Sequence, residues 1–450
     1  MKASSTVVAG AALTSAVPAS AMAGGFFSAG SDTVKVGLVG AGGRGSGAII
    51  QALNSRSSNV ELSAIGDVYP NRVNGTLGAM RRELGEGVPL PAEDHRFTGL
   101  DAFLRVLESD CQVVMLCTPP GFRPMQFEEA IRAGKHVFME KPVAVDVPGV
   151  RRVLKATEEA KQKGLAVAVG LQRRHEEAYR DIIERLQNGA IGDIVTARVY
   201  WNQGSLWVAD RLPDESELSY QIRNWLYFNW LSGDHIVEQH IHNLDVINWI
   251  MNDYPVTAYG MGGRQVRTGP HHGQIFDHHA VEYTYANGVK MFSQCRQIPE
   301  CADSVTEWVH GTRGSCDIAG GRIFDSSGAL IYQTSGSRGG HQQEQTDLFA
   351  DLARGVIPNE GEYGAKSTMT AIMGRLATYS GKMIDLNRAM DSEISLADVN
   401  AMTSLDLEPP VKPLANGEYP VPVPGSGWRE VLDWNPDRRG RRRENQEDDD

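Results

Sequence analysis

The stretch TVKVGLVGAGGRGSGAIIQALN, residues 33–54, changes its pattern in the middle. It begins with a short run rich in valine and leucine, which is typical of a buried parallel strand. A glycine-rich turn follows, and beyond it the apolar residues favour a helix. The stretch therefore predicts strand, turn and helix in succession, the opening unit of a doubly wound α/β sheet.

The turn matches the pattern G-x-G-x-x-G at Gly40, Gly42 and Gly45. The first glycine makes the tight turn, the second lets the backbone approach a pyrophosphate, and the third packs the helix on the strand. The helix N-terminus then offers unpaired N–H groups to phosphate oxygens. The turn predicts a dinucleotide site. We also assign Gly43 and Arg44 to this site, while a surface position for Arg44 stays open.

An acid ends the next predicted strand, residues 60–67, as the dinucleotide pattern requires. Asp67 is expected to accept hydrogen bonds from the adenosine ribose, and its charge would repel a 2′-phosphate. That favours NAD as the cofactor. Arg72 lies five residues further on and is assigned to the same site, where it keeps NADP possible.

Strands and helices alternate over residues 33–170, which predicts an N-terminal doubly wound parallel sheet. Beyond residue 171 strand-like runs follow with few helices between them. Asn287-Gly288 separates two such runs and is a strong hairpin signal. We expect residues 171–385 to form an α+β domain with a large, mostly antiparallel open sheet, and residues 386–450 to form an extended segment with a charged tail.

Residues 1–32 have the composition of a targeting leader. Residues 6–23 are small and apolar and end in Ala-Met-Ala, which fits a cleavage site. The segment resembles the part of a twin-arginine signal that follows its arginine pair, but the pair itself is absent. We expect export to the periplasm, with a cytoplasmic protein as the alternative.

The composition restricts the partners. The net charge of −12 leaves no basic surplus for phosphates, which argues against nucleic acid. No run after the leader is long and apolar enough for a membrane span. The five cysteines form no Cys-x-x-Cys pair, so cysteine zinc and redox motifs are unsupported.

The segment SGDHIVEQHIHNLD, residues 232–245, concentrates histidines and acids. If one helix runs from a cap at Ser232 or Asp234 to residue 251, His240 points away. Four polar residues then share one face: His235, Glu238, His242 and Asp245. Three hypotheses remain: an acid–base pair, a buried polar face, and a metal triad of His235, Glu238 and His242. His-Glu-x-x-His is absent, and we expect no metal.

A second motif, Glu140-Lys141-Pro142, closes the block AGKHVFMEKP about 100 residues after the glycine turn. A lysine at the carboxyl end of a parallel strand faces the cofactor crevice. Together with Thr118-Pro119-Pro120 and the later histidine segment, these motifs resemble the Gfo/Idh/MocA oxidoreductase family over about residues 33–385. We assign Thr118, Pro119, Glu140 and Lys141 to the cofactor site.

The resemblance implies a Rossmann domain, an open-sheet domain that often carries a homodimer or homotetramer interface, and hydride transfer at a sugar or polyol carbon. It places the catalytic lysine at Lys141, the histidine at His242 and the acid at Glu238, where family members commonly have aspartate. From the chemistry we expect His242 to act as base, Glu238 to orient it, and Lys141 to stabilise alkoxide charge.

Further residues are expected to contact the substrate. Arg173, Arg174 and His175 follow the last strand of the first sheet, and Asp245 belongs to the polar face. Surface charge is the alternative for the three basic residues. The aromatic run at residues 220–230 would either stack on sugar rings or form a core.

Three functions remain open. The first is an NAD(P)-dependent oxidoreductase of a sugar, glycoside or polyol whose nicotinamide cofactor stays tightly bound, as export would require. The second is redox-neutral glycoside cleavage through a 3-keto intermediate, which the resemblance also allows. The third is a non-catalytic nucleotide- or carbohydrate-binding protein, for which the lysine–histidine set would be expected to be incomplete.

Overall fold

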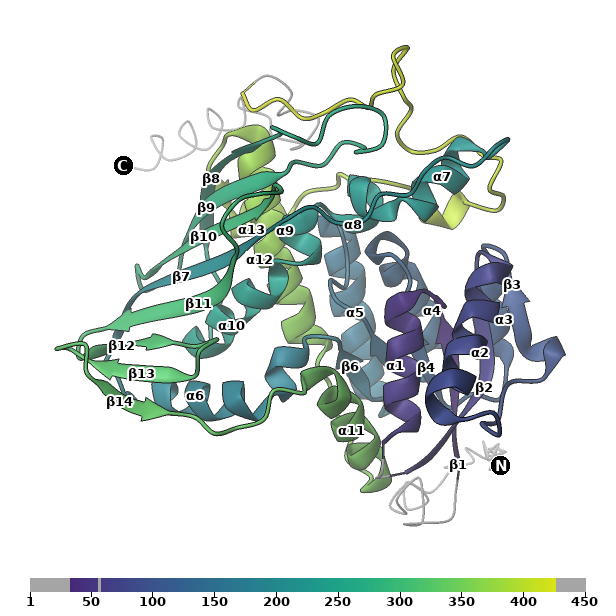
Figure 1. Cartoon of the computed structure of the whole chain (residues 1–450), viewed down its shortest axis with the longest axis horizontal. Helices are drawn as coiled ribbons and strands as arrows, with labels where there is room; N and C mark the ends of the chain where they lie inside the picture. The colour runs from purple at the N-terminus through teal and green to yellow at the C-terminus, as the bar shows by residue number, and fades with distance from the viewer. Residues whose placement is uncertain (1–32, 56–57, 426–450) are drawn as a thin grey trace, which may run out of the picture.

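The computed structural model describes residues 33–55 and 58–425. Two sheets dominate it: a parallel sheet near the N-terminus and a larger sheet beside it (Figure 1). The leader and the charged tail lie outside the described residues. Within the described part of the chain, no helix is long and apolar enough to cross a membrane.

The first sheet has six parallel strands in the order β3-β2-β1-β4-β5-β6, which is the predicted doubly wound arrangement. Its strands are β1 (Thr33–Val39), β2 (Asn59–Asp67), β3 (Arg96–Thr98), β4 (Val113–Leu116), β5 (His136–Met139) and β6 (Val167–Val169). The connecting helices are α1 (Gly43–Leu53), α2 (Pro70–Leu84), η2 (Glu93–His95), α3 (Ala102–Glu108), η3 (Pro120–Phe122), α4 (Arg123–Arg132) and α5 (Val147–Lys163). Every residue of β4 and β5 is buried, because helices cover both faces.

The second sheet has nine strands in the order β14-β13-β12-β11-β7-β10-β9-β8-β15. They are β7 (Ile194–Gln203), β8 (Thr257–Gly263), β9 (His278–Thr284), β10 (Lys290–Gln297), β11 (Ser304–Gly311), β12 (Gly314–Asp317), β13 (Arg322–Asp325), β14 (Leu330–Gln333) and β15 (Ile384–Asp385). All its pairs are antiparallel except β7 with β10. The Asn-Gly hairpin joins β9 to β10 as predicted, with Gly288 at φ 85°.

Helices cover one face of this sheet and leave the other without a helix (Figure 1). The helices of this half of the chain are η4 (Gln172–His175), α6 (Glu177–Gln187), α7 (Glu217–Arg223), η5 (Trp225–Tyr227), α8 (Asn229–Ser232), α9 (His235–Glu238), α10 (Ile241–Met251), α11 (Gly340–Ala353) and α12 (Gly361–Ser380). Helix α11 packs on α1, and its Leu348, Phe349 and Leu352 join the core of the first sheet. The two sheets therefore share a packed boundary.

The chain after residue 385 contains α13 (Leu386–Met390) and η6 (Val399–Ala401) and is otherwise extended. It returns across α7: Ser216 Oγ donates to the Leu405 oxygen at 2.6 Å, and Gln221 Nε2 donates to the Val411 oxygen at 2.6 Å. The predicted extended segment is thus packed against the second domain (Figure 1).

The single helix predicted over residues 234–251 is wrong. Helix α9 ends at Glu238 and α10 begins at Ile241. Between them, the amide of His240 donates to the oxygen of His235, and the amide of His242 donates to the oxygen of Gln239. The interruption arises from tertiary contact, because the His240 ring bonds to Ser293 of β10 at 2.8 Å.

Candidate active site

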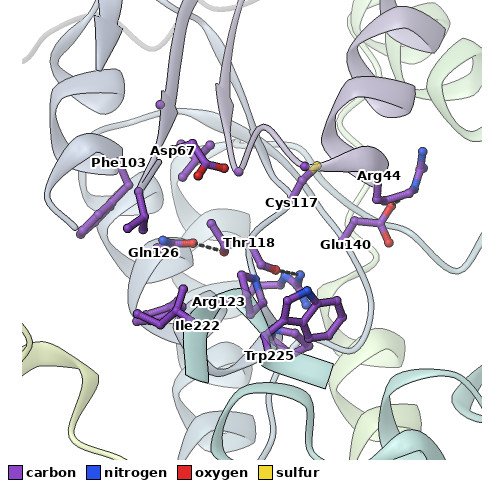
Figure 2. A pocket seen from close by; sticks show the side chains of 18 of the residues that line it. Arg44, Asp67, Phe103, Cys117, Thr118, Arg123, Gln126, Glu140, Ile222 and Trp225 are labelled. Carbon is purple, nitrogen blue, oxygen red and sulfur yellow. Dashed lines mark hydrogen bonds and ion pairs between the residues drawn. The ribbon is translucent and has the colours of Figure 1, made fainter. Parts of the chain in front are cut away.

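A cavity of about 1100 Å³ lies where the carboxyl ends of the first sheet face the second domain. In an open α/β sheet this edge is where ligands bind. Figure 2 shows side chains from both domains around it. Most of the residues assigned to the cofactor line this cavity: Gly40, Gly42, Gly43, Arg44, Asp67, Arg72, Thr118, Pro119, Glu140 and Lys141.

The glycine turn has the geometry that its sequence predicts. Gly40 has φ 92°, a conformation that favours glycine, and a Cβ on it would lie 2.6 Å from the backbone of Thr118. A Cβ on Gly45 would lie 1.9 Å from the oxygen of Gly40, so this glycine permits the close contact of helix and strand. Gly42 and Gly43 face open space. The turn thus leaves room for a phosphate beside the α1 N-terminus.

Asp67 ends β2 and holds the turn in place. Its Oδ2 accepts from the amide of Ala41 at 2.7 Å, and its Oδ1 accepts from the amide of Tyr69 at 2.9 Å. Burial raises the pKa of Asp67, although these two bonds and the charge of Arg72 oppose the shift. Asp67 therefore supports the pyrophosphate loop in addition to facing the cavity.

Arg44 bridges the two domains. Its guanidinium pairs with Glu140 and lies 2.6 Å from Oε1 of Glu344 on α11. It also donates to Gln51 at 3.0 Å. Burial would raise the pKa of Glu140, but Arg44 and Lys141 lower it overall. Arg44 lies at the cavity, and its charge is balanced by acids before any phosphate binds.

Lys141 meets the second domain at the base of the cavity. Its Nζ lies 2.8 Å from Oε1 of Glu238 and 2.6 Å from the main-chain oxygen of the same residue. Both side chains are mostly shielded from solvent, each 13% exposed. Glutamate at this position therefore reaches the lysine.

His242 lines the same cavity from the first turn of α10. Its ring stacks on Trp201 of β7, with centroids 5.9 Å apart. Burial lowers the pKa of His242 well below 6.5, and the positive charges of Lys141 and Arg173 lower it further. The imidazole is therefore neutral near pH 7 and can accept a proton.

The expected four-residue polar face is not formed, because the helix is interrupted. Glu238 and His242 reach the cavity, whereas His235 and Asp245 are buried away from its lining. His240 points elsewhere, as predicted. A metal triad of His235, Glu238 and His242 is not assembled.

The assignment of Arg173, Arg174 and Asp245 to the substrate does not fit the structure. Arg174 donates to both carboxylate oxygens of Asp245 at 2.8 Å, and Arg173 pairs with the buried Glu307. None of the three lines the cavity. The prediction placed the arginines correctly after β6, but acids of the second domain bind their guanidinium groups.

His175, also expected at the substrate, lies outside the cavity lining as well. Its Nδ1 lies 2.7 Å from Asp347, and its Nε2 lies 3.3 Å from Glu360. Although burial would lower its pKa, these two carboxylates raise the pKa of His175 to about 9. This charged histidine links η4 to α11 through Asp347 and to the start of α12 through Glu360.

Several cavity residues were not identified from the sequence. Trp201, Gln239 and His341 surround the Lys141–His242 region, and Trp207 and Trp225 line the cavity from the segment before α8. Four residues of the C-terminal segment also contribute: Val399, Asn400, Met402 and Thr403. Of the aromatic run, Tyr227, Phe228 and Trp230 are core residues, as the alternative interpretation predicted.

The residues present fit a bound dinucleotide. A Cβ on Gly42 or Gly43 would enter free space at the cavity, and Asp67 stands at the end of β2 for the ribose. When bound, the nicotinamide supplies a hydride acceptor. The chain supplies a neutral imidazole, an ammonium and a carboxylate next to one another, a set that can remove a hydroxyl proton and stabilise the resulting oxyanion.

Two family models match most of the described chain. Residues 34–171 match the oxidoreductase family with an NAD-binding Rossmann fold, and residues 179–317 match the GFO/IDH/MocA C-terminal domain. The first sheet is therefore an NAD-binding Rossmann domain, and the function is that of an NAD-dependent oxidoreductase.

Individual relatives agree with this fold. An inositol 2-dehydrogenase of Rhizobium meliloti is 24% identical over 284 residues, 63% of this chain and 74% of that protein. The structure of a Lactobacillus casei scyllo-inositol dehydrogenase with NAD(H) and scyllo-inositol matches with a TM-score of 0.58 and 20% identity. The match covers 79% of this chain and 100% of that one. A levoglucosan dehydrogenase with NADH and levoglucosan has a TM-score of 0.62, 17% identity and the same coverage. The chain belongs to the Gfo/Idh/MocA family of oxidoreductases.

Proposed function

We propose that this protein oxidises a hydroxyl group of a sugar, glycoside or polyol, with hydride transfer to a tightly held NAD. The observation that carries the proposal is the contact of Lys141 with Glu238 across the domain boundary, in a cavity that also holds His242 and the glycine turn. In this assignment His242 takes the hydroxyl proton and Lys141 stabilises the developing oxyanion. Glu238, which was expected to orient His242, orients the lysine instead, because its carboxylate contacts Nζ of Lys141.

The relatives' names support this substrate class. They include inositol 2-dehydrogenases and, among the structures, a complex with levoglucosan. Each of these ligands is a compact ring bearing hydroxyl groups. The ring of Trp201, which stacks on His242, offers an apolar face beside the reacting position, as carbohydrate rings require.

A cover over the adenosine side of the cavity supports a cofactor that stays bound. Figure 2 shows Ile222 and Trp225 beside Thr118 and Gln126 of α4. Met402 and Thr403 of the C-terminal segment line the same cavity. The segment before α8 and the C-terminal segment both line the cleft, and we expect cofactor release to need their movement.

One assay tests the function and separates the alternatives. Purified protein is mixed with a panel of sugars, polyols and aryl glycosides, while NADH absorbance and aglycone release are followed together. NADH formation supports net oxidation. Aglycone release without net reduction would replace it with redox-neutral cleavage through a 3-keto intermediate. Ligand binding with neither signal would support the non-catalytic alternative.

We also propose a homodimer or homotetramer formed through the uncovered face of the second sheet. Tyr259, Glu282 and Phe292 are neighbours across β8, β9 and β10 on one face. Tyr259 and Phe292 are exposed, and Met261 on the same face is 72% exposed. Light scattering of the wild type and of a Met261→Glu/Phe292→Glu variant tests this proposal. If the wild type is a monomer, the proposal is refuted. If the wild type is an oligomer and the variant is a monomer, the proposal is supported.

Export is proposed from the leader composition alone. The small apolar run at residues 6–23 supports it. Cell fractionation of the full chain and of a chain lacking residues 1–24 provides the test. Equal cytoplasmic retention of both would favour the cytoplasmic alternative.

A further inference from the structure

A second cluster of metal-ligating side chains lies outside the cavity. Asp234 and His235 stand at the start of α9, and His279 lies on β9; all three are buried. One ligand atom from each lies within 4.8 Å of the others. None of the three lines the cavity, so the catalytic assignment leaves the cluster unexplained.

The hydrogen bonds fix the tautomer of His279. Thr378 Oγ1 donates to the oxygen of Arg375 at 3.0 Å, so it accepts from Nδ1 of His279 at 2.9 Å. A neutral ring then presents the lone pair of Nε2 to Asp234 Oδ2, only 3.3 Å away. Two lone pairs facing each other in a buried site require a proton or a cation between them.

The ring nitrogens of His235 indicate whether a proton or a cation lies between Asp234 and His279. Both of its ring nitrogens are buried and lack a hydrogen-bond partner, although Nε2 lies 3.9 Å from Asp234 Oδ1. A buried polar group without a partner destabilises the fold, and such a group calls for an explanation such as a bound ion. A proton shared by Asp234 and His279 leaves His235 unsatisfied, whereas one cation can satisfy all three residues.

The Asp234 carboxylate is held in place but not paired. Tyr379 and the amide of Phe276 donate to its Oδ2 at 2.6 and 2.9 Å. Over residues 33–55 and 58–425 no lysine or arginine nitrogen is recorded within 4 Å of this carboxylate. The nearby Arg375 donates instead to the oxygens of Val145 and Gly233. A buried carboxylate without a direct cationic partner favours a metal ion.

We propose that Asp234, His235 and His279 bind a divalent transition-metal ion, with zinc as the best match. Two ligands of a tetrahedral zinc lie about 3.3 Å apart. Nε2 of His279 lies 3.3 Å from Oδ2 of Asp234, and Nε2 of His235 lies 3.9 Å from Oδ1, close to this value. Imidazole and carboxylate suit zinc. A water molecule would complete the site, and Cys295, directly opposite His279 in the β9–β10 pair, is a buried thiol next to it in the sheet.

The ion would act as a structural link, separate from the reaction. It would tie the start of α9, three residues before Glu238, to β9 of the second sheet. This set of ligands differs from the triad that the sequence suggested. Because the site is independent of the cofactor cavity, its metal content can be measured whether or not the proposed oxidation is observed.

The test measures metal in the full chain, purified without a histidine tag from zinc-supplemented medium. Elemental analysis should find about one zinc per chain in the wild type. His235→Asn and His279→Asn should each reduce the zinc content per chain at least about tenfold, because each removes one of the three ligands. His240→Asn is the matched control, because His240 is equally buried but bonds to Ser293 outside the cluster; it should keep its zinc.

A second measurement covers variants that do not fold. Wild-type protein is stripped with a chelator and titrated with Co²⁺. A tetrahedral cobalt spectrum and a rise in Tm on adding Zn²⁺ support the site, and a thiolate charge-transfer band would identify Cys295 as the fourth ligand. Zinc-free wild type with no cobalt spectrum and no Tm shift overturns the proposal and leaves a protonated Asp234–His279 pair.

Discussion

Nζ of Lys141 lies 2.8 Å from Oε1 of Glu238 and 2.6 Å from the main-chain oxygen of the same residue. The two residues come from different domains and are 97 positions apart in the sequence. The contact holds the ammonium of Lys141 at the C-terminal end of α9, near His242. A group that must stabilise charge in a transition state works best when its position is fixed beforehand.

Replacing Lys141 with methionine is expected to lower kcat by about a thousandfold, because the oxyanion loses its cation. NAD bound per chain should stay unchanged, since the glycine turn and Asp67 remain. Stopped-flow turnover and mass spectrometry of cofactor released from denatured protein measure the two effects. Lys161→Met, a change at an exposed lysine on α5, is the control. Wild-type rates in Lys141→Met would remove the lysine from the mechanism.

His242 predicts an unusual pH profile. Burial and the charges of Lys141 and Arg173 hold its pKa well below 6.5. The base is therefore neutral down to low pH, and the acid limb of kcat/KM should fall below pH 6.5. Nuclear magnetic resonance of the His242 ring in Lys141→Met should show a higher pKa, because one of the positive charges that lower it is gone. An acid limb at 6.5, or an unchanged ring pKa in the variant, would argue against this role.

The parts of the site that the sequence predicted are local in origin. Gly40 and Gly45 occupy positions where a side chain would collide with backbone, and that requirement is visible in the motif. Asp67 ends β2 and Lys141 follows the end of β5, so their place at one edge of the sheet follows from topology. The doubly wound parallel arrangement of the first sheet and the β9–β10 hairpin were predicted for the same reason.

The parts that it did not predict depend on distant partners. Arg174 was expected to bind substrate, but it pairs with Asp245, 71 positions away. The break between α9 and α10 has no proline or glycine within it, and it follows from contact of His240 with Ser293. The C-terminal residues at the cavity, such as Met402, follow an extended segment that carries no motif.

The C-terminal residues that line the cofactor cavity predict slow release of NAD. Removing residues 391–450 takes away Val399 and Met402 from the cavity lining and should lower the NAD that co-purifies at least about tenfold, because an enclosed ligand dissociates more slowly. Removing residues 426–450 alone is the control and should leave the NAD content unchanged. If the longer deletion does not fold, Met402→Ala takes its place, with a faster release rate expected. Equal NAD content in all variants would show that the segment does not retain the cofactor.

His175 predicts how stability changes with pH. Its carboxylate partners, Asp347 and Glu360, raise its folded pKa to about 9 from 6.5. Because the folded state binds the proton more tightly than the unfolded state, the extra stability is fully present below pH 6.5 and is lost as pH rises through about 9. The shift corresponds to at most about 3 kcal/mol of unfolding free energy.

Urea unfolding of the wild type and of His175→Gln between these pH values measures this contribution. The difference in unfolding free energy between the wild type and the variant should shrink as pH rises. Asp347→Asn should move that loss to lower pH, because one of the two acids is gone. Gln343→Ala removes only a neutral 2.7 Å bond to Asp347 and should largely keep the wild-type dependence. A wild-type advantage that is constant from pH 6 to pH 10 would mean that the histidine is not held in its charged form by these carboxylates.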